Sequence, residues 1–486
     1  MPPLSRSENS PTISLPARVA TVAADVDVLV VGGGPAGLGA ALGAATAGAR
    51  VVLTERYGFL GGNATAALVM PLTSFHAHRN RTPSIDETAL FPPDQGPGEP
   101  VVAGAFRHLL RRLVRARGAL TPTERTGFTV PFDPEVFKHV ALELLDKAGV
   151  HFLLHAFASG VLGRDGRAGG AVLETKSGPV VVRARAVVDC TGDGDIAALA
   201  GAPFAVGREQ DGLVQPMTLM FRMVQLEREA FAAYARAHPD QWRGVYGLWD
   251  LVARATAAGE LDLPREDVLF FGTPHEHEVS VNSTRVTGAL GTSVWDLTRA
   301  EWESRRQLAQ IAAFLRKYVP GFAQAYVAQS GTTIGVRETR RVRGDYELTA
   351  ADVLTARKFD DVVARGAYPI DIHDPAGKGT RLERVPPGDA YDIPLRCLLP
   401  QRLEDVVVAG RCISGTHEAH SSYRVMPISM ATGHAAGICA ALAALTRRAT
   451  REVPSVDVQR ELLRQHADLG RLNRELRSAD VASSHG

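Results

Sequence analysis

The sequence predicts an α/β fold in which a doubly wound, mainly parallel sheet is interrupted by an inserted segment. Three observations predict it. From residue 27, a short apolar strand, a glycine-rich turn, a helix and a second strand follow one another. Apolar strands that end in glycine turns return near residues 190 and 410. Between these returns the composition changes over residues 204–329, which are rich in tryptophan and charged side chains.

Composition excludes several classes of protein. The chain has 486 residues, too many for one simple core, which suggests two interleaved domains. Its net charge of +1 gives no reason to expect nucleic acid or an anionic membrane as partner. The four cysteines form no C-x-x-C pair, which favours a reduced, cytoplasmic compartment. We expect no membrane span, because no stretch approaches about 18 consecutive apolar residues.

A nucleotide-binding signature begins with residues 28–31, an apolar β-branched run typical of a strand buried on both faces. A G-x-G-x-x-G turn follows at Gly32, Gly34 and Gly37. A helix is then expected over 38–47, and a second strand ends in Glu55, whose carboxylate can accept hydrogen bonds from an adenosine ribose. Glycines let the backbone approach a pyrophosphate, and the helix N-terminus offers it free N–H groups. The alternative is an ordinary glycine-rich turn, but the complete βαβ unit predicts dinucleotide binding.

The middle of the chain divides by composition. Apolar spacing predicts helices over 106–117 and 134–148, and proline and glycine predict a loop over 80–100. A strand within 149–162 would bring its backbone, at Ala158, near the adenine. We divide the chain into a flexible leader (1–25), the first part of the nucleotide-binding domain (26–203), a cap or substrate domain (204–329), a return segment (330–446) and a C-terminal helical tail (447–486).

Three further glycine turns carry a resemblance to a known family. They read GGNAT at 61–65, TGD at 191–193 and AGR at 409–411. In this order they resemble the FAD-dependent oxidoreductase family, related to the flavoprotein superfamily of fumarate reductase and succinate dehydrogenase. The resemblance implies a discontinuous, glutathione-reductase-like FAD-binding Rossmann domain with an inserted α+β cap, and non-covalently bound FAD. The residues expected to bind the cofactor, from the fingerprint and the resemblance together, are Gly32, Gly34, Pro35, Ala36, Gly37, Glu55, Arg56, Gly61, Gly62, Asn63, Ala64, Thr65, Ala158, Thr191, Gly192, Asp193, Gly410, Arg411, Ile428 and Ser429.

The stretch SGTHEAHSSYR, residues 414–424, is the candidate reactive segment. A helix is expected to follow it, and the resemblance aims the N-terminus of that helix at the flavin, where positive charge stabilises the reduced ring. Fumarate-reductase-like enzymes place Gly-x-His and then an arginine here; GTH and Arg424 follow that order, with Tyr423 where an asparagine is usual. A histidine is a good general base near neutral pH. Either His417 or His420 would take the proton, or both would only pack against FAD; Arg424 would stabilise charge on substrate or flavin.

Two more arginines complete the candidate catalytic set. Arg337 lies in the run GVRETRRVRGD, where it either pairs with acidic neighbours or binds an anionic substrate. Arg285 lies on an expected strand, EVSVNSTRV, which either has a solvated face at a sheet edge or turns Asn282 or Arg285 toward the flavin cleft. His275 and His277 have no third ligand at a useful spacing, so no metal is expected.

Together these expectations favour an enzyme that transfers a hydride between FAD and a small organic substrate at a C–OH or C–N centre. Reduction of a C=C bond is the alternative reaction. A non-catalytic FAD-binding electron-transfer subunit is the alternative class, and the lack of cysteine clusters for an iron–sulfur relay weighs against it. The partners would be a small-molecule substrate and an electron acceptor of a kind that the sequence leaves open; a homo-oligomer also fits the sequence.

Overall fold

The computed structural model describes residues 12–78, 90–91, 97–123, 129–163, 166–377 and 379–473. Most of the loop expected over 80–100 lies outside these residues, and so do parts of the expected leader and of the expected C-terminal tail.

Helices and strands alternate in the first half of the chain. The α-helices are α1 Pro35–Thr46, α2 Ala105–Arg115, α3 Pro134–Lys147, α4 Asp195–Leu199, α5 Arg228–Ala237, α6 Trp249–Ala257, α7 Val294–Tyr318, α8 Ala350–Leu354, α9 His417–Tyr423, α10 Met426–Thr446 and α11 Ser455–Arg464. The strands are β1 Thr21–Val31, β2 Val51–Thr54, β3 His76–His78, β4 Pro97–Pro100, β5 His151–Leu153, β6 Phe157–Val161, β7 Gly170–Thr175, β8 Gly178–Asp189, β9 Phe204–Val206, β10 Phe221–Val224, β11 Tyr246–Gly247, β12 Val268–Gly272, β13 Glu278–Val281, β14 Tyr326–Ser330, β15 Arg340–Val342, β16 Val362–Gly366, β17 Ile370–His373, β18 Thr380–Glu383, β19 Tyr391–Pro394 and β20 Val406–Val408.

The main sheet has seven strands in the order β5-β2-β1-β8-β7-β6, with β20 also pairing with β8. The strands β5, β2, β1, β8 and β20 run parallel, whereas β6 and β7 form an antiparallel meander with β8. The central parallel strands are buried on both faces, as the continuous apolar run 28–31 predicts: its side chains are at most 3% exposed. The edge strand β5 is largely exposed. The mixed α/β class and its parallel sheet are confirmed.

The first strand begins earlier than the sequence predicts. We expected a leader through residue 25, but β1 already starts at Thr21. Its first half pairs with the start of β8, Thr21 opposite Val180, because the twelve-residue strand β8 extends beyond the core and offers unpaired backbone groups there. Residues 21–24 read Thr-Val-Ala-Ala and show no alternation of apolar and polar side chains, so the sequence does not reveal a half-buried strand there.

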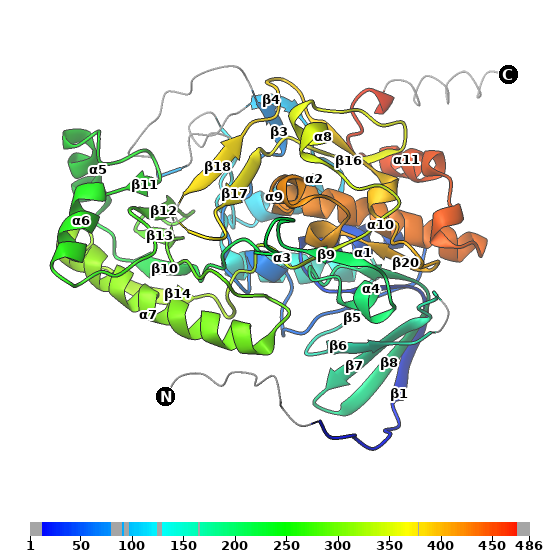
Figure 1. The fold of residues 1–486 in the computed structure, drawn as a ribbon. Coiled ribbons are helices and arrows are strands. Elements are labelled where there is room, and N and C mark those ends of the chain that lie inside the picture. The colour runs from blue at the N-terminus through cyan, green and yellow to red at the C-terminus, as the bar shows by residue number, and fades with distance from the viewer. Residues whose placement is uncertain are drawn as a thin grey trace.

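Helices α1 and α10 cross at very short range beside this sheet (Figure 1). A Cβ atom added at Gly433 would lie 1.9 Å from the carbonyl oxygen of Ala36, and one added at Gly437 would lie 2.0 Å from that of Ala40. No side chain fits at either position, so the two glycines set the distance between the helices. The crossing therefore holds the first turn of α1 against the first half of α10.

Among the described residues, α10 is also the one helix long and apolar enough to cross a membrane. Of its most apolar window, 83% is buried inside the protein, and the helix contacts α1, α11 and the strands β1, β8 and β16. This burial is that of a central core helix.

The segment inserted between β9 and β15 builds a second sheet in the order β11-β12-β13-β10-β14. Helices α5, α6 and α7 accompany this sheet, and all of these elements lie together on one side of the molecule, coloured green in Figure 1. Phe231 packs at its centre, edge-on to Trp242 and Phe270. The strand expected at EVSVNSTRV is β13, and the edge-strand alternative is wrong: β13 lies between β12 and β10, and all four of its residues are buried.

Candidate active site

Four backbone turns meet at the carboxyl ends of the parallel strands, after β1, β2, β8 and β20. A Cβ atom at Gly62 would lie 2.8 Å from the Cα of Gly34, and a Cβ atom at Gly410 would lie 2.9 Å from the Cβ of Ala36. Most of the residues expected to bind a cofactor lie in these turns or in the first turns of α1 and α10: Gly32, Gly34, Pro35, Ala36, Gly37, Gly61, Gly62, Asn63, Ala64, Thr65, Thr191, Gly192, Asp193, Gly410, Arg411, Ile428 and Ser429.

The N-terminus of α1 is open toward an anion. Gly34 is its N-cap residue and makes no side-chain capping bond, so the first N–H groups of the helix keep no side-chain acceptor. Around the position of a Cβ at Gly34, Gly62 supplies the nearest described atom, 3.6 Å away. In contrast, a Cβ at Gly37 would lie 1.8 Å from the carbonyl oxygen of Gly32, so that glycine is required by the turn itself. The two glycines thus have different roles.

Glu55, at the end of β2, is tied to the backbone of the neighbouring turns. Its carboxylate accepts hydrogen bonds from the N–H groups of Gly33 (2.7 Å) and Tyr57 (3.0 Å), and it is only 5% exposed. Burial raises the pKa of this carboxyl above its usual range, although the two backbone bonds act against that shift. Arg56 is exposed and lies over the Tyr57 ring at 4.9 Å. The expected adenine strand reaches this turn through the backbone N–H of Ala156, which bonds the carbonyl of Glu55.

Ala158, the residue we expected near the adenine, lies two positions further on, in β6. There it pairs with Leu173 of β7.

The return segment connects the turns after β2, β8 and β20. The carbonyl oxygen of Val336 accepts a hydrogen bond from Asn63 Nδ2 (3.3 Å) and another from Arg411 Nη1 (3.0 Å). Arg411 also pairs with Asp193, which accepts the hydroxyl of Thr339 at 2.8 Å. One peptide group and one ion pair therefore hold three separate motifs in register.

A buried histidine–carboxylate pair lies beside these turns. The stretch expected only to precede a helix is itself a short helix, α9, capped by Thr416. His417 begins it, and its Nδ1 lies 2.9 Å from Oε1 of Glu338, which is fully buried. The same carboxylate pairs with Arg341 and accepts the backbone N–H of Gln215 at 3.0 Å. His417 Nε2 is buried without a hydrogen-bond partner among the described residues.

The other two candidate residues of α9, His420 and Tyr423, are placed differently. His420 is fully buried, and neither ring nitrogen has a partner among the described residues. Burial and the nearby guanidiniums, Arg341 first, hold the pKa of His420 well below its usual range. The Tyr423 hydroxyl donates to the carbonyl of Ile413 at 2.9 Å, and the ring packs against Gly415. This bonding favours a structural role for Tyr423 over the expected catalytic one.

Three arginines that we expected near the substrate come together from distant parts of the chain. Arg337 donates to the carbonyl of Pro216 (2.8 Å) and to the hydroxyl of Thr218 (2.5 Å). Arg424, between α9 and α10, makes two long contacts of 3.5 Å, one of them to Oε1 of Gln215. Arg285 donates to the carbonyl of Gly377 (3.1 Å) and lies 3.3 Å from His373 Nδ1.

Sequence reasoning missed two residues of this site, Glu338 and Gln215. Glu338 was considered only as an ion-pair partner for the arginines of its own run, and it does pair with Arg341. Its contact with His417 spans 79 residues, and that between Gln215 and Arg424 spans 209, so no local pattern could reveal either. The available signal for Glu338 was its place in the sequence, as the one acidic residue among four arginines within seven residues.

Comparison with known proteins decides the family. The model of the family described as FAD dependent oxidoreductase matches residues 27–462. The chain belongs to this family. It is therefore an FAD-dependent oxidoreductase, a flavoenzyme whose cofactor is FAD.

Solved structures similar to this FAD-dependent oxidoreductase are distant, and no curated protein sequence matched it. A geranylgeranyl bacteriochlorophyll reductase-like protein from Thermoplasma acidophilum is 14% identical, with a TM-score of 0.41 over 91% of this chain and 82% of that one. p-Nitrophenol 4-monooxygenase PnpA from Pseudomonas putida DLL-E4 is 13% identical, with a TM-score of 0.41 over 90% of this chain and 82% of that one. The flavin-dependent brominase Bmp2 is 11% identical, with a TM-score of 0.45 over 90% of this chain and 83% of that one. Similarity at this level carries no argument about the reaction.

The residues present fit FAD. The open backbone at Gly34 and the uncapped N-terminus of α1 suit a pyrophosphate, and the carboxylate of Glu55 lies at the end of β2, where a ribose is bound in dinucleotide folds. The N-terminus of α10, with N-cap Val425, has no side-chain cap either and would stabilise negative charge on the flavin. Among the described residues no group of three histidine, cysteine or acidic side chains could hold a metal ion.

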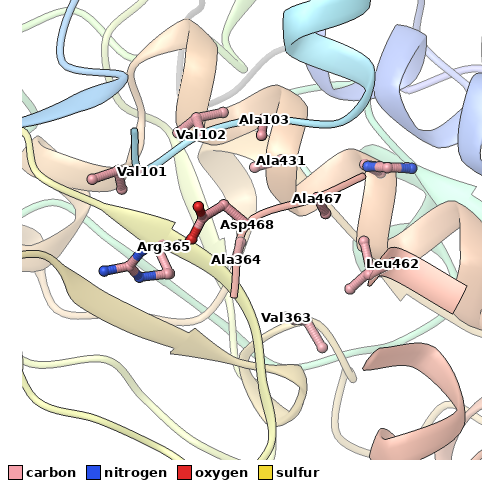
Figure 2. A pocket seen from close by; sticks show the side chains of 11 residues that line it. Val101, Val102, Ala103, Val363, Ala364, Arg365, Ala431, Leu462, Ala467 and Asp468 are labelled. Atoms are coloured by element: carbon pink, nitrogen blue, oxygen red, sulfur yellow. Dashed lines mark hydrogen bonds and ion pairs between the residues drawn. The ribbon is translucent and has the colours of Figure 1, made fainter. Parts of the chain in front are cut away.

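A small cavity elsewhere in the flavoenzyme is separate from this site. It has a volume of about 10 Å³, room for one water molecule, and lies between residues 101–103, the strand β16 and residues 467–468 (Figure 2). Arg365 and Asp468, which line it, form an ion pair with a 2.7 Å contact. The cavity thus surrounds a paired charge and is too small for a substrate.

Proposed function

We propose that this flavoenzyme removes a hydride from a C–OH or C–N centre of a small organic substrate, and that His417 takes the accompanying proton. One observation carries the proposal. His417 is held at Nδ1 by the buried carboxylate of Glu338, at 2.9 Å, while its Nε2 has no described partner. A carboxylate at Nδ1 fixes the proton on that nitrogen, which leaves the Nε2 lone pair free to act as a base.

The chain's own residues supply the proton chemistry. FAD, when bound, supplies the acceptor for the hydride. His417 accepts the proton of the substrate hydroxyl or amine at Nε2, and Glu338 stabilises the imidazolium that forms. Arg341 and the backbone N–H of Gln215 both bond to the oxygens of Glu338 and hold its side chain in place beside His417.

His417 is favoured over His420 as the base. His420 lacks a carboxylate partner among the described residues, and burial beside guanidiniums disfavours its protonated form. A base must accept a proton readily during the reaction, so an environment that opposes the imidazolium works against this role. His420 instead packs edge-on against Tyr423 at 5.5 Å, which supports a structural function.

Reduction of a C=C bond, the reaction of fumarate-reductase-type enzymes, is the second candidate. The same pair supports it, because the carboxylate of Glu338 also stabilises a protonated His417 that could donate its proton to a substrate carbon. The direction of proton transfer separates the two reactions: an oxidation requires neutral His417, whereas a reduction requires the imidazolium.

The test is anaerobic stopped-flow measurement of flavin reduction against a panel of alcohols and amines, across pH, followed by admission of air. We expect a substrate to bleach the flavin, and His417→Ala to slow that step by about 10²- to 10⁴-fold while FAD stays bound. The wild-type rate should fall at low pH, where the imidazole is protonated, and this dependence should disappear in His417→Ala. The exposed His139, on α3, provides the control variant His139→Ala.

Unchanged flavin reduction in His417→Ala and in His420→Ala would refute a histidine base. A flavin that no panel member bleaches, but that an external reductant and a carrier protein cycle, would identify an electron-transfer subunit instead.

Three finer assignments belong to the proposal. FAD is held non-covalently, with Asn63 roughly at the position where a tethering histidine would be expected; acid precipitation should release intact FAD. The flavin domain is glutathione-reductase-like, and the protein is cytoplasmic, in keeping with four cysteines that are all buried and free.

A further inference from the structure

Arginines from three parts of the chain form a cationic cluster in which Arg285 is buried and the other two are half-buried. We define the arginine cluster as Arg285, Arg337 and Arg424. None of the three forms an ion pair with a described carboxylate, whereas Arg341, the other buried arginine among the described residues, pairs with Glu338. Arg265, which is close to them, is itself paired with Asp267 at 2.7 Å. A buried charge without a partner is strongly unfavourable, so a cluster of three calls for an anion.

Electrostatics confirm that the three guanidiniums face one another. Burial, and then Arg424, lower the pKa of Arg337 to about 9, with Arg285 adding to the shift. Burial and the same three arginines hold the pKa of His373 well below its usual range. Asp371, which accepts the Tyr368 hydroxyl at 2.9 Å, is the carboxylate that acts on Arg337. Asp267 and Asp374 act on Arg285 more strongly than Asp371 does, but they pair with Arg265 and Arg208 outside the cluster. Three guanidiniums and one carboxylate leave a net charge of about +2.

Unsatisfied donors point to the same conclusion. Arg424 Nε and Gln215 Nε2 are buried, and neither has a hydrogen-bond partner among the described residues. Gln215 is only 1% exposed, and its Oε1 contacts Arg424, so its amide donors lie beside the cluster. Each buried donor left unpaired costs about 1–3 kcal/mol. A ligand with several acceptor oxygens would satisfy both.

The cluster adjoins the proposed reaction centre. Arg337 directly follows Val336, whose carbonyl is bonded by Asn63 and Arg411 of the cofactor turns. Arg424 precedes Val425, the N-cap residue of α10. Gln215 bonds Glu338, the partner of His417, through its backbone N–H. An anionic group held here would place the rest of a small molecule near His417.

We propose that the substrate carries an anionic oxygen group, a carboxylate or a phosphate, and that Arg285, Arg337 and Arg424 bind it. The proposal rests on the proposed function for the identity of the site, but not on His417 as the base. Guanidinium forks bind both groups through paired hydrogen bonds, which explains why arginines and a glutamine amide, all donors, come together here. Arg285 comes from the inserted segment and Arg424 from the cofactor side, so the anion would also link the two parts.

The experiment measures anion binding to the FAD-loaded enzyme through its visible flavin spectrum and its melting temperature. The probes are sodium malonate and sodium phosphate, with malonamide as the uncharged match, at ionic strength held constant with sodium chloride. We expect a saturable response to at least one anion and none to malonamide; the tighter anion identifies the group as carboxylate or phosphate. Arg285→Gln and Arg337→Gln should each weaken binding about tenfold or more, the factor for one charge-assisted hydrogen bond.

Arg236→Gln, an exposed arginine of α5, is the control and should bind the probes like the wild type. Arg285→Lys, which keeps the charge, serves if a glutamine variant fails to fold, and should bind more weakly than the wild type. Equal responses to malonate and malonamide, or anion binding unchanged in the cluster variants, would overturn the inference. If His417→Ala reduces its flavin at the wild-type rate while the anions still bind, only the proposed reaction is refuted.

Discussion

Replacing Gly34 with alanine separates cofactor binding from folding. Gly34 has φ −73° and ψ −175°, an extended conformation open to any residue, and the new methyl would lie 3.6 Å from the nearest described atom. Alanine is a poorer N-cap than glycine by about 1 kcal/mol, and it gains about 0.4–1 kcal/mol from a less flexible unfolded chain. These effects nearly cancel, so the melting temperature of the apoprotein should change by no more than about 3 °C.

The cofactor should respond very differently. A methyl at Gly34 lies where the pyrophosphate must approach the backbone, and each charge-assisted hydrogen bond lost there costs about 1.5–3 kcal/mol. FAD affinity should therefore fall at least about tenfold per lost bond. Titration of apoprotein with FAD, followed by flavin fluorescence, measures this, and thermal melts of the same apoprotein measure the fold.

Gly37→Ala is the matched control, because its methyl would lie 1.8 Å from the Gly32 carbonyl oxygen and must disrupt the turn. That variant should lose both stability and FAD. Wild-type FAD affinity in Gly34→Ala would refute the placement of the pyrophosphate at this glycine. A large loss of apoprotein stability would show instead that Gly34 serves the fold.

Three further predictions follow from buried groups. Glu338→Gln should slow flavin reduction, because Nδ1 of His417 loses the carboxylate that orients its ring; an unchanged rate would contradict the pairing. Gly433→Ala must force α10 from α1 and should destabilise the protein by about 1–3 kcal/mol or more and weaken FAD binding, whereas Leu445→Ala, at an exposed position of the same helix, should do neither in thermal melts. Burial raises the pKa of Asp392 from 3.8 to about 6, so the folded state holds this proton more tightly and the carboxyl lowers the unfolding free energy as pH rises from about 4 to 6. Asp392→Asn should flatten that decline, by up to about 3 kcal/mol in urea unfolding at several pH values, and an identical slope in both proteins would show that the carboxyl ionises normally.

The glycine turns could be predicted from sequence because each one expresses a local backbone requirement. Gly32 has φ +101° and Gly410 has φ +80°, conformations that other residues rarely adopt. The glycine at each position therefore indicates the turn directly. The mixed α/β class followed from the same turns and the apolar strands between them. The start of β1 could not be predicted, because apolar and polar residues do not alternate in its exposed half. That half forms a strand only because it pairs with β8.

The site was harder to predict than the fold for a related reason. His417 could be selected from the sequence because it lies in the polar stretch 414–424. Its role, however, depends on its contact with Glu338, which comes from another segment of the chain. Arg285 was expected on an edge strand, whereas the strand before it, β13, is central and buried, because β10, from an earlier part of the inserted segment, pairs with the side that β12 leaves open. Tertiary pairing, which no local periodicity encodes, decided each of these cases.

The shared carbonyl of Val336 couples the two halves of the catalytic apparatus thermodynamically. Asn63 and Arg411 hold it from the cofactor turns, and the next residue in the chain belongs to the arginine cluster. If the cofactor turns relax in the apoprotein, the anion-binding arginines are also held less firmly. By linkage, FAD and the anion would then each increase the affinity of the protein for the other. The enzyme would thus bind FAD more tightly when its substrate is bound.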